Sequence, residues 1–125
     1  MRRYSLNTED QEQRTLIEWC ELNRQKYPQL DSLFAVPNGK MRHPAIAAQL
    51  KLEGVKPGVP DLFLSFPSNG YHGCYIEMKR LVGGRLSDNQ KIWRDRLTAN
   101  GYCVQVCKGW EAAKEAIIYY LTPQP

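Results

Sequence analysis

Two short apolar runs, joined by turn-forming residues, constrain the fold of this chain more than any other feature. The runs are residues 62–66 and 74–78, and the residues between them include Pro67, Asn69, Gly70 and Gly73. An Asn-Gly pair between two apolar runs is the strongest short-range signal for an antiparallel hairpin. We therefore predict two neighbouring strands near the middle of the chain.

The predicted hairpin has one charged face, because side chains alternate between the two faces of a strand. If the turn centres on Gly70, Asp61 lies opposite Lys79, and Phe63 lies opposite Glu77. Asp61, Glu77 and Lys79 then share one face. The other face is apolar and consists of Leu62, Leu64, Ile76 and Met78.

The charged face needs an explanation, because burying charges within apolar strands costs free energy unless the charges are paired or bind a metal. Two carboxylates are the hard oxygen ligands that Mg²⁺, Mn²⁺ and Ca²⁺ prefer. A neighbouring lysine can stabilise a developing anion, or position or deprotonate a water. The combination suits metal-dependent hydrolysis of phosphodiesters. The structural alternative is an Asp–Lys cross-strand pair beside a half-exposed glutamate.

Three sequence blocks surround these charges. They are Gly58-Val59-Pro60-Asp61-Leu62, Ile76-Glu77-Met78-Lys79-Arg80 and Gly84-Arg85-Leu86-Ser87-Asp88-Asn89-Gln90. In this order and spacing they resemble the VRR-NUC nuclease domain of the PD-(D/E)xK superfamily, above all the short stand-alone versions of phages and prophages. The resemblance runs from about residue 9 to residue 121. It implies one domain over residues 1–125 with a restriction-endonuclease-like core.

The resemblance also implies a metal site for Mg²⁺ or Mn²⁺. Asp61 and Glu77 would be ligands, and the carbonyl of Met78 would be another. The family adds an acidic residue of the first helix, usually four residues before a glutamine, and Glu9 has this spacing to Gln13. The alternative role for Glu9 is to stabilise the helix N-terminus electrostatically, and Glu12 is then the fallback ligand.

Two further residues complete the catalytic set that the resemblance implies, Lys79 and Gln90. Gln90 also has a structural explanation, because Ser87 and Gln90 have the spacing of a capping box that opens a helix. Asn38 stands where the family often has an asparagine close to the site. As part of a Pro-Asn-Gly sequence, it is equally explained as a turn former.

Basic residues flank the carboxylates in sequence, and the chain carries a net charge of +4. A basic rim around an acidic centre suits a phosphate backbone, although ordinary solvated surface would explain either basic cluster alone. The candidates for contacts with DNA are Lys40, Arg42, Arg80, Arg85, Lys91 and Arg94.

The predicted function is metal-dependent endonucleolytic cleavage of DNA, acting in replication, repair or recombination. A domain this small has little room for a base-reading module, so we expect selectivity for Holliday junctions, flaps or other branched DNA, and a homodimer. One alternative is a non-catalytic nucleic-acid-binding module that stacks bases on tyrosines and tryptophans. Another is a small metabolic phosphohydrolase.

The rest of the pattern predicts a single α/β layered domain with a small mixed sheet flanked by helices. The expected order is helix, strand, helix, strand, strand, helix, strand, helix. The expected ranges are 9–26, 32–36, 44–53, 62–66, 74–78, 88–100, 102–106 and 110–121.

Composition excludes several other classes. No apolar run approaches the ~20 residues that span a bilayer. The first residues lack the apolar segment of a signal peptide, so a cytoplasmic location is expected. The four cysteines form no CxxC pair. We expect buried free thiols in such a chain, with a zinc site as the alternative.

Overall fold

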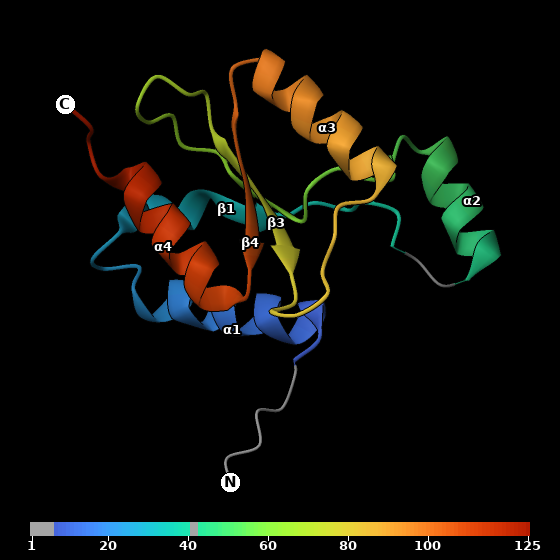
Figure 1. The fold of residues 1–125 in the computed structure, drawn as a ribbon, viewed down its shortest axis with the longest axis horizontal. Helices are drawn as coiled ribbons and strands as arrows, with labels where there is room; N and C mark the ends of the chain where they lie inside the picture. Colours follow the sequence, from blue (N-terminus) through green and yellow to red (C-terminus); the bar gives the residue numbers. More distant parts are fainter. Residues whose placement is uncertain (1–6, 41–42) are drawn as a thin grey trace, which may run out of the picture.

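The computed structural model describes residues 7–40 and 43–125, which fold into four helices around one small sheet (Figure 1). The helices are α1 (Glu9–Leu22), α2 (Pro44–Leu52), α3 (Asp88–Ala99) and α4 (Trp110–Leu121). The strands are β1 (Leu33–Ala35), β2 (Leu62–Leu64), β3 (Cys74–Lys79) and β4 (Cys103–Lys108). The predicted element order and mixed α/β class are confirmed.

The four strands lie in the order β1-β2-β3-β4. The pairs β1–β2 and β2–β3 are antiparallel, whereas β3–β4 is parallel and is connected through α3. Helices α1 and α4 pack on each other and against β3 (Figure 1). The core between them contains the fully buried side chains of Leu16, Leu62, Ile76 and Ile117. Helix α2 stands apart from the sheet and buries none of its residues (Figure 1).

Capping boxes begin two of the helices, as the sequence predicts. The Thr8 hydroxyl accepts from the backbone N–H of Gln11, and the Gln11 side chain accepts from the backbone of Thr8. Ser87 and Gln90 form the same reciprocal pair at the start of α3. Each box satisfies two backbone donors that a helix N-terminus otherwise leaves unpaired.

Several element boundaries differ from the prediction by one or two residues, among them β2, which ends at Leu64 and not at residue 66, and β4, which covers Cys103–Lys108 and not 102–106. The largest difference is at the end of α1, where the chain turns before it reaches Pro28. Helix α1 ends at Leu22, four residues before the predicted end at Lys26, with Asn23 as its C-cap. A short 3₁₀ helix, Pro28–Ser32, then precedes β1 and was not predicted. Proline is favoured in a first helical turn, where its missing N–H has no partner to lose.

The register of the central hairpin also differs from the prediction, by two residues. Leu62 pairs with Ile76 and Leu64 with Cys74, so continuing the ladder places Asp61 opposite Glu77, not opposite Lys79. The turn is centred on the Asn69-Gly70 pair, both with positive φ, inside a Ser68–Tyr71 bridge. A slip of two residues leaves every side chain on its original face. The predicted convergence of charges therefore survives the wrong register.

No helix in residues 7–40 and 43–125 combines the length and the apolar character that crossing a bilayer requires. All four cysteines are buried free thiols, as predicted.

Candidate active site

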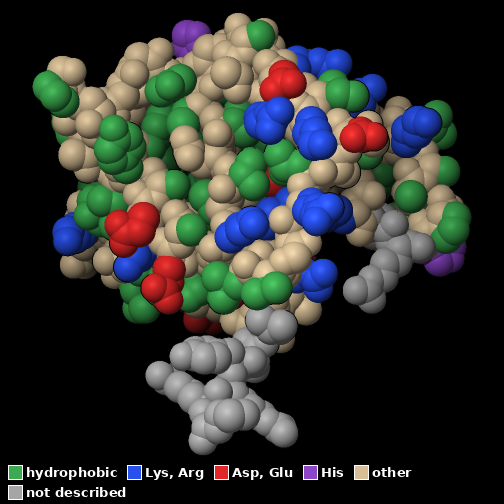
Figure 2. Space-filling view, viewed as in Figure 1, with side chains coloured by type: hydrophobic (Ala, Val, Ile, Leu, Met, Phe, Trp, Pro, Cys, Tyr) green, Lys and Arg blue, Asp and Glu red, His purple; other side chains and the backbone are tan. Residues whose placement is uncertain are grey.

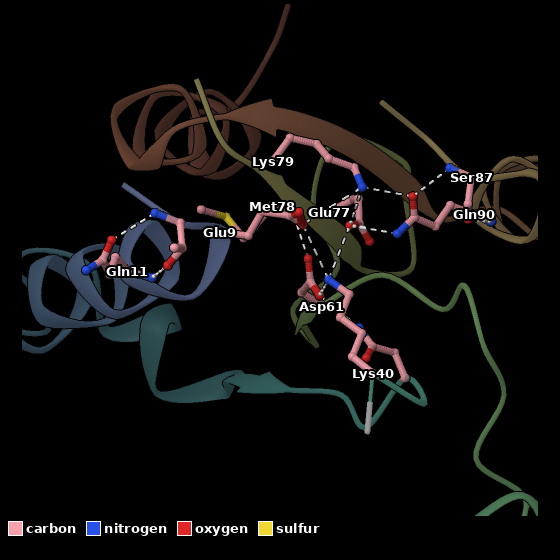
Figure 3. A network of polar contacts seen from close by, with 11 residues as sticks. Glu9, Gln11, Lys40, Asp61, Glu77, Met78, Lys79, Ser87 and Gln90 are labelled. Atoms are coloured by element: carbon pink, nitrogen blue, oxygen red, sulfur yellow. Dashed lines mark hydrogen bonds and ion pairs between the residues drawn. The ribbon is translucent and has the colours of Figure 1, made fainter. Parts of the chain in front are cut away.

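Asp61, the residue before β2, is buried and fully hydrogen-bonded. Its Oδ1 accepts from Asn38 Nδ2 at 2.8 Å and from Lys40 Nζ at 2.7 Å. Its Oδ2 accepts from the backbone N–H of Met78 at 2.8 Å. These contacts fix the carboxylate against β3 (Figure 3). They also place Asn38 at the site, which the sequence left open.

Glu77, on β3, is buried to 1% exposure beside Asp61. Its Oε2 accepts from Gln90 Nε2 at 3.2 Å and lies 3.4 Å from Lys79 Nζ. Its Oε1 is buried and has no hydrogen-bond partner among residues 7–40 and 43–125. Burial and the neighbouring charge of Asp61 raise the pKa of Glu77 to about 8, although Lys40 and Lys79 act in the opposite direction. The two lysines therefore offset only part of the cost of ionising Glu77 in the folded protein.

Lys79 and Gln90 form one hydrogen-bonded unit with Glu77 (Figure 3). Lys79 Nζ donates to Gln90 Oε1 at 2.9 Å, and the same oxygen accepts from the backbone N–H of Ser87 at 2.9 Å. The side chain of Lys79 is only 6% exposed. Gln90 therefore caps α3 and contacts two candidate catalytic residues at once. The predicted cap is confirmed, and the catalytic role of Gln90 stays a prediction.

Lys40, which the sequence predicts to contact DNA, reaches into the acidic centre in the structure. Its Nζ reaches one oxygen each of Asp61 (2.7 Å), Glu9 (3.6 Å) and Glu77 (3.8 Å). Partial burial alone would lower the pKa of Lys40, but the hydrogen bond and charge of Asp61, with the charges of Glu77 and Glu9, raise it. The sequence placed Lys40 among the basic residues that flank the carboxylates, but gave no sign that it would contact them.

The structure separates the two acidic candidates of α1. Glu9 Oε1 lies 3.6 Å from Lys40 Nζ and 3.9 Å from Lys79 Nζ, at the edge of the site. Glu12 points elsewhere: it is 2% exposed, and its Oε2 accepts from the backbone N–H of Trp110 at 2.7 Å. A carboxylate at that position stabilises the N-terminus of α4. Glu12 is therefore a structural residue, and Glu9 is the α1 acid that faces the site.

A close backbone contact brings the loop before Asp61 against the start of α3. Gly58 has a φ of +93°, and a Cβ built on it would lie 2.5 Å from the backbone carbon of Asn89. Only glycine tolerates both the conformation and the approach. This contact joins the segment that carries Asp61 to the helix that carries Gln90.

Basic side chains gather over and beside α3 on the face seen in Figure 2. Arg80 and Arg85 line an open pocket of about 450 Å³ together with Glu9. Lys40 and Glu9 line a second one, of about 300 Å³. Lys91 and Arg94 lie on α3, where Lys91 is exposed and Arg94 pairs with Asp95 at 3.0 Å. Arg42, the remaining DNA-binding candidate, lies outside the described residues.

Within the described part of the chain, no three His, Cys, Asp or Glu side chains converge closely enough to hold a metal ion by themselves. The zinc alternative therefore has no support in these residues. Two carboxylates, Asp61 and Glu77, do meet across neighbouring strands, and Glu9 stands beyond the two lysines. A cation at this centre would complete its coordination with water or backbone oxygen, as Mg²⁺ commonly does.

Comparison with known proteins agrees with this geometry. A family model described as the VRR-NUC domain matches residues 7–111. The chain belongs to the VRR-NUC domain family. A solved structure called a VRR_NUC domain protein is 32% identical in sequence and has a TM-score of 0.79, covering 94% of this chain and 90% of that one. No curated protein matches the chain.

Membership of the VRR-NUC family confirms the resemblance seen in the sequence and assigns the chain to a nuclease-like class in general terms. All of the predicted catalytic and metal-binding residues lie inside the matched range of the VRR-NUC model.

Proposed function

We propose that this VRR-NUC chain is a divalent-metal-dependent endonuclease that hydrolyses phosphodiester bonds of DNA, with a preference for branched substrates. One observation carries the proposal. Asp61, Glu77, Lys79 and Gln90 converge on the sheet face opposite the apolar core, and one buried oxygen of Glu77 has no partner in the part of the chain that the structure describes. Buried polar atoms in folded proteins are nearly always satisfied, so an orphaned carboxylate oxygen calls for a ligand.

The residues present fit Mg²⁺ or Mn²⁺. The donor set is oxygen-only, from carboxylates on two neighbouring strands, which is the chemistry that hard cations prefer. Asp61 and the unpaired Oε1 of Glu77 would hold the cation, the Met78 carbonyl would add a ligand, and Glu9 would act through water. When bound, such a cation makes a water more acidic and draws charge from the scissile phosphate.

The side chains of this protein would position the reacting groups and stabilise the developing charge. Lys79, held by Gln90, is placed to orient the attacking water or to donate to a phosphate oxygen as negative charge develops. The water forms a new P–O bond and one ester P–O bond breaks, leaving a phosphate monoester and a hydroxyl group. Asn38 and the Met78 amide would keep Asp61 oriented during the reaction. A residue held this tightly loses little entropy on reaching the reactive geometry.

Basic side chains on either side of Glu9 would bind the DNA backbone. Arg80 and Arg85 lie on one side and Lys40 on the other, so adjacent phosphates of one strand would lie across the acidic centre. Lys91 and Arg94 extend this surface along α3. Contacts to phosphates carry no sequence information, which is why we propose recognition of DNA shape. Cutting two strands of a junction requires two such sites, and a two-fold dimer is the commonest way to supply them.

The test is a panel of labelled DNA substrates (linear duplex, flap and four-way junction), each incubated with Mg²⁺, Mn²⁺ or a chelator. We expect cleavage only with metal, and greater cleavage of the branched substrates. Glu77→Ala and Lys79→Ala should abolish it while circular dichroism shows an intact fold. Lys114→Met, a change in a lysine on α4 that pairs with Glu115 away from the site, is the matched control. Full activity of either site variant would refute the assignment.

The dimer is tested separately by the mass of the protein in solution, measured by light scattering with and without junction DNA. We expect two chains per particle when the junction is bound. One chain per cleaved junction would remove the dimer from the proposal without affecting the chemistry.

A further inference from the structure

Lys40 stands in the middle of the acidic centre, although it does not come from the sheet. Its ammonium group contacts one oxygen of each of the three acids, and its 2.7 Å contact with Asp61 Oδ1 is the shortest ion pair at the site. Figure 3 shows it reaching Asp61 from the side opposite Lys79. A single positive charge thus lies where two carboxylates would otherwise face each other.

The two lysines of the site differ in how they are held. Lys79 comes from β3, is 6% exposed and hydrogen-bonds to Gln90. Lys40 follows a turn at Gly39 and has a side chain that is 45% exposed. Within the described part of the chain, its ammonium group is held by carboxylates alone, without an amide such as that of Gln90. Releasing such a side chain to solvent restores rotamer freedom, which offsets part of the lost attraction. Lys40 can leave the site without disturbing the sheet, whereas Lys79 cannot.

The charges of the site favour such an exchange. In the state that binds metal, all three carboxyls are ionised, and Glu9, Asp61 and Glu77 against two lysines leave one net negative charge. Adding a divalent cation while Lys40 stays would leave a net positive charge, with two cations competing for Asp61 Oδ1. Exchanging Lys40 for the divalent cation leaves the site neutral. A neutral buried cluster is the least costly of these states.

We propose that Lys40 is a built-in counter-ion of the metal site, which neutralises Asp61 in the metal-free protein and is displaced when the divalent cation binds. This inference rests on the proposed function. In this proposal Lys40 sets the affinity of the site for metal, whereas other residues are the metal ligands. It also gives Lys40 two positions: on Asp61 before metal binds, and free to contact a DNA phosphate afterwards.

The experiment compares Mn²⁺ binding, measured by calorimetry without DNA, among wild type, Lys40→Met, Lys40→Arg and Lys51→Met. Methionine keeps the length and apolar stem of lysine but removes its charge. We expect Lys40→Met to bind Mn²⁺ about tenfold more tightly, a change of about 1.4 kcal/mol. Lys40→Arg keeps the competing charge and should stay near wild type. Lys51, an exposed lysine in the last turn of α2, provides the matched control and should have no effect.

A second readout is thermal. At the same excess of Mn²⁺, the melting temperature of Lys40→Met should rise more than that of wild type, because the stabilisation of the folded state by a ligand grows with the logarithm of its affinity. Unchanged or weaker Mn²⁺ binding by Lys40→Met overturns the inference, as does equal tightening in Lys40→Arg.

The inference and the proposed function fail differently. If wild type cleaves DNA with metal but Lys40→Met binds Mn²⁺ no better, only the counter-ion role falls. If the tightening is observed but no DNA is cut, the counter-ion role stands and the nuclease proposal falls. If no variant binds Mn²⁺ at all, both are wrong.

Discussion

Replacing Glu77 by glutamine should stabilise the metal-free protein at high pH, even though it removes a proposed metal ligand. The change keeps the shape of the side chain and removes its charge. Glu77 is buried, its Oε1 has no partner, and burial beside Asp61 raises its pKa from 4.5 to about 8. An acid with a raised pKa in the folded state stabilises that state when protonated. This contribution is complete below about pH 4.5 and is lost as the pH rises through about 8.

The magnitude follows from the size of the pKa change. At about 1.4 kcal/mol per unit of pKa, a rise from 4.5 to about 8 corresponds to a cost of at most roughly 5 kcal/mol when Glu77 ionises. Glutamine avoids that cost, but it leaves Lys79, at 3.4 Å, with less opposite charge nearby. We therefore expect a net gain of about 2 kcal/mol at pH 9, roughly one half of the maximum. In a domain of this size that gain raises the melting temperature by several degrees.

The assay is thermal or urea unfolding at pH 5, 7 and 9 in a chelator, for wild type and Glu77→Gln. The difference between the two proteins should be small at pH 5 and grow with pH. Glu18→Gln, which changes an exposed acid on α1, controls for the loss of a negative charge in general. Adding Mn²⁺ at pH 9 should stabilise wild type and have little effect on Glu77→Gln. A variant that is less stable than wild type at pH 9, or equally stabilised at all three pH values, would refute this reasoning.

Three further predictions concern single positions. Glu12→Ala should lower the free energy of unfolding by about 2–3 kcal/mol, because the Trp110 amide loses a charged acceptor at 2.7 Å; urea unfolding measures the loss, and DNA cleavage per folded molecule should persist. Gly58→Ala should lower both stability and cleavage, since its Cβ would meet the Asn89 backbone at 2.5 Å; a folded, fully active variant would contradict this. Lys91→Ala should weaken DNA binding and reduce the slope of affinity against salt by about 1, which a fluorescence anisotropy titration at several salt concentrations tests.

Local rules decided much of the fold before any tertiary contact was considered. The period-two alternation places Asp61, Glu77 and Lys79 on one face whatever the register, because a shift by two residues changes no side chain's face. The capping boxes at Thr8 and Ser87 depend on residues three apart, so the sequence alone locates both helix starts. The family resemblance could also be recognised from the sequence alone, because it depends on blocks of adjacent residues.

Contacts that depend on packing between distant segments could not be predicted from the sequence. The choice between Glu9 and Glu12 depends on how α1 is rotated against β3 and α4, and only the tertiary structure turns Glu12 toward Trp110. The hairpin register depends on where an extra residue is accommodated between the turn and the strands, which local turn preferences do not fix.

The sequence by itself determined which chemical groups this protein brings to its sheet, because strand and helix periodicities are local. The tertiary structure alone decided which of those groups touch. It placed Lys40 on Asp61 and left one oxygen of Glu77 unpaired. The physical reason is that an ion pair or an orphaned atom depends on distances of a few ångströms between residues far apart in the chain, and those distances are set by packing.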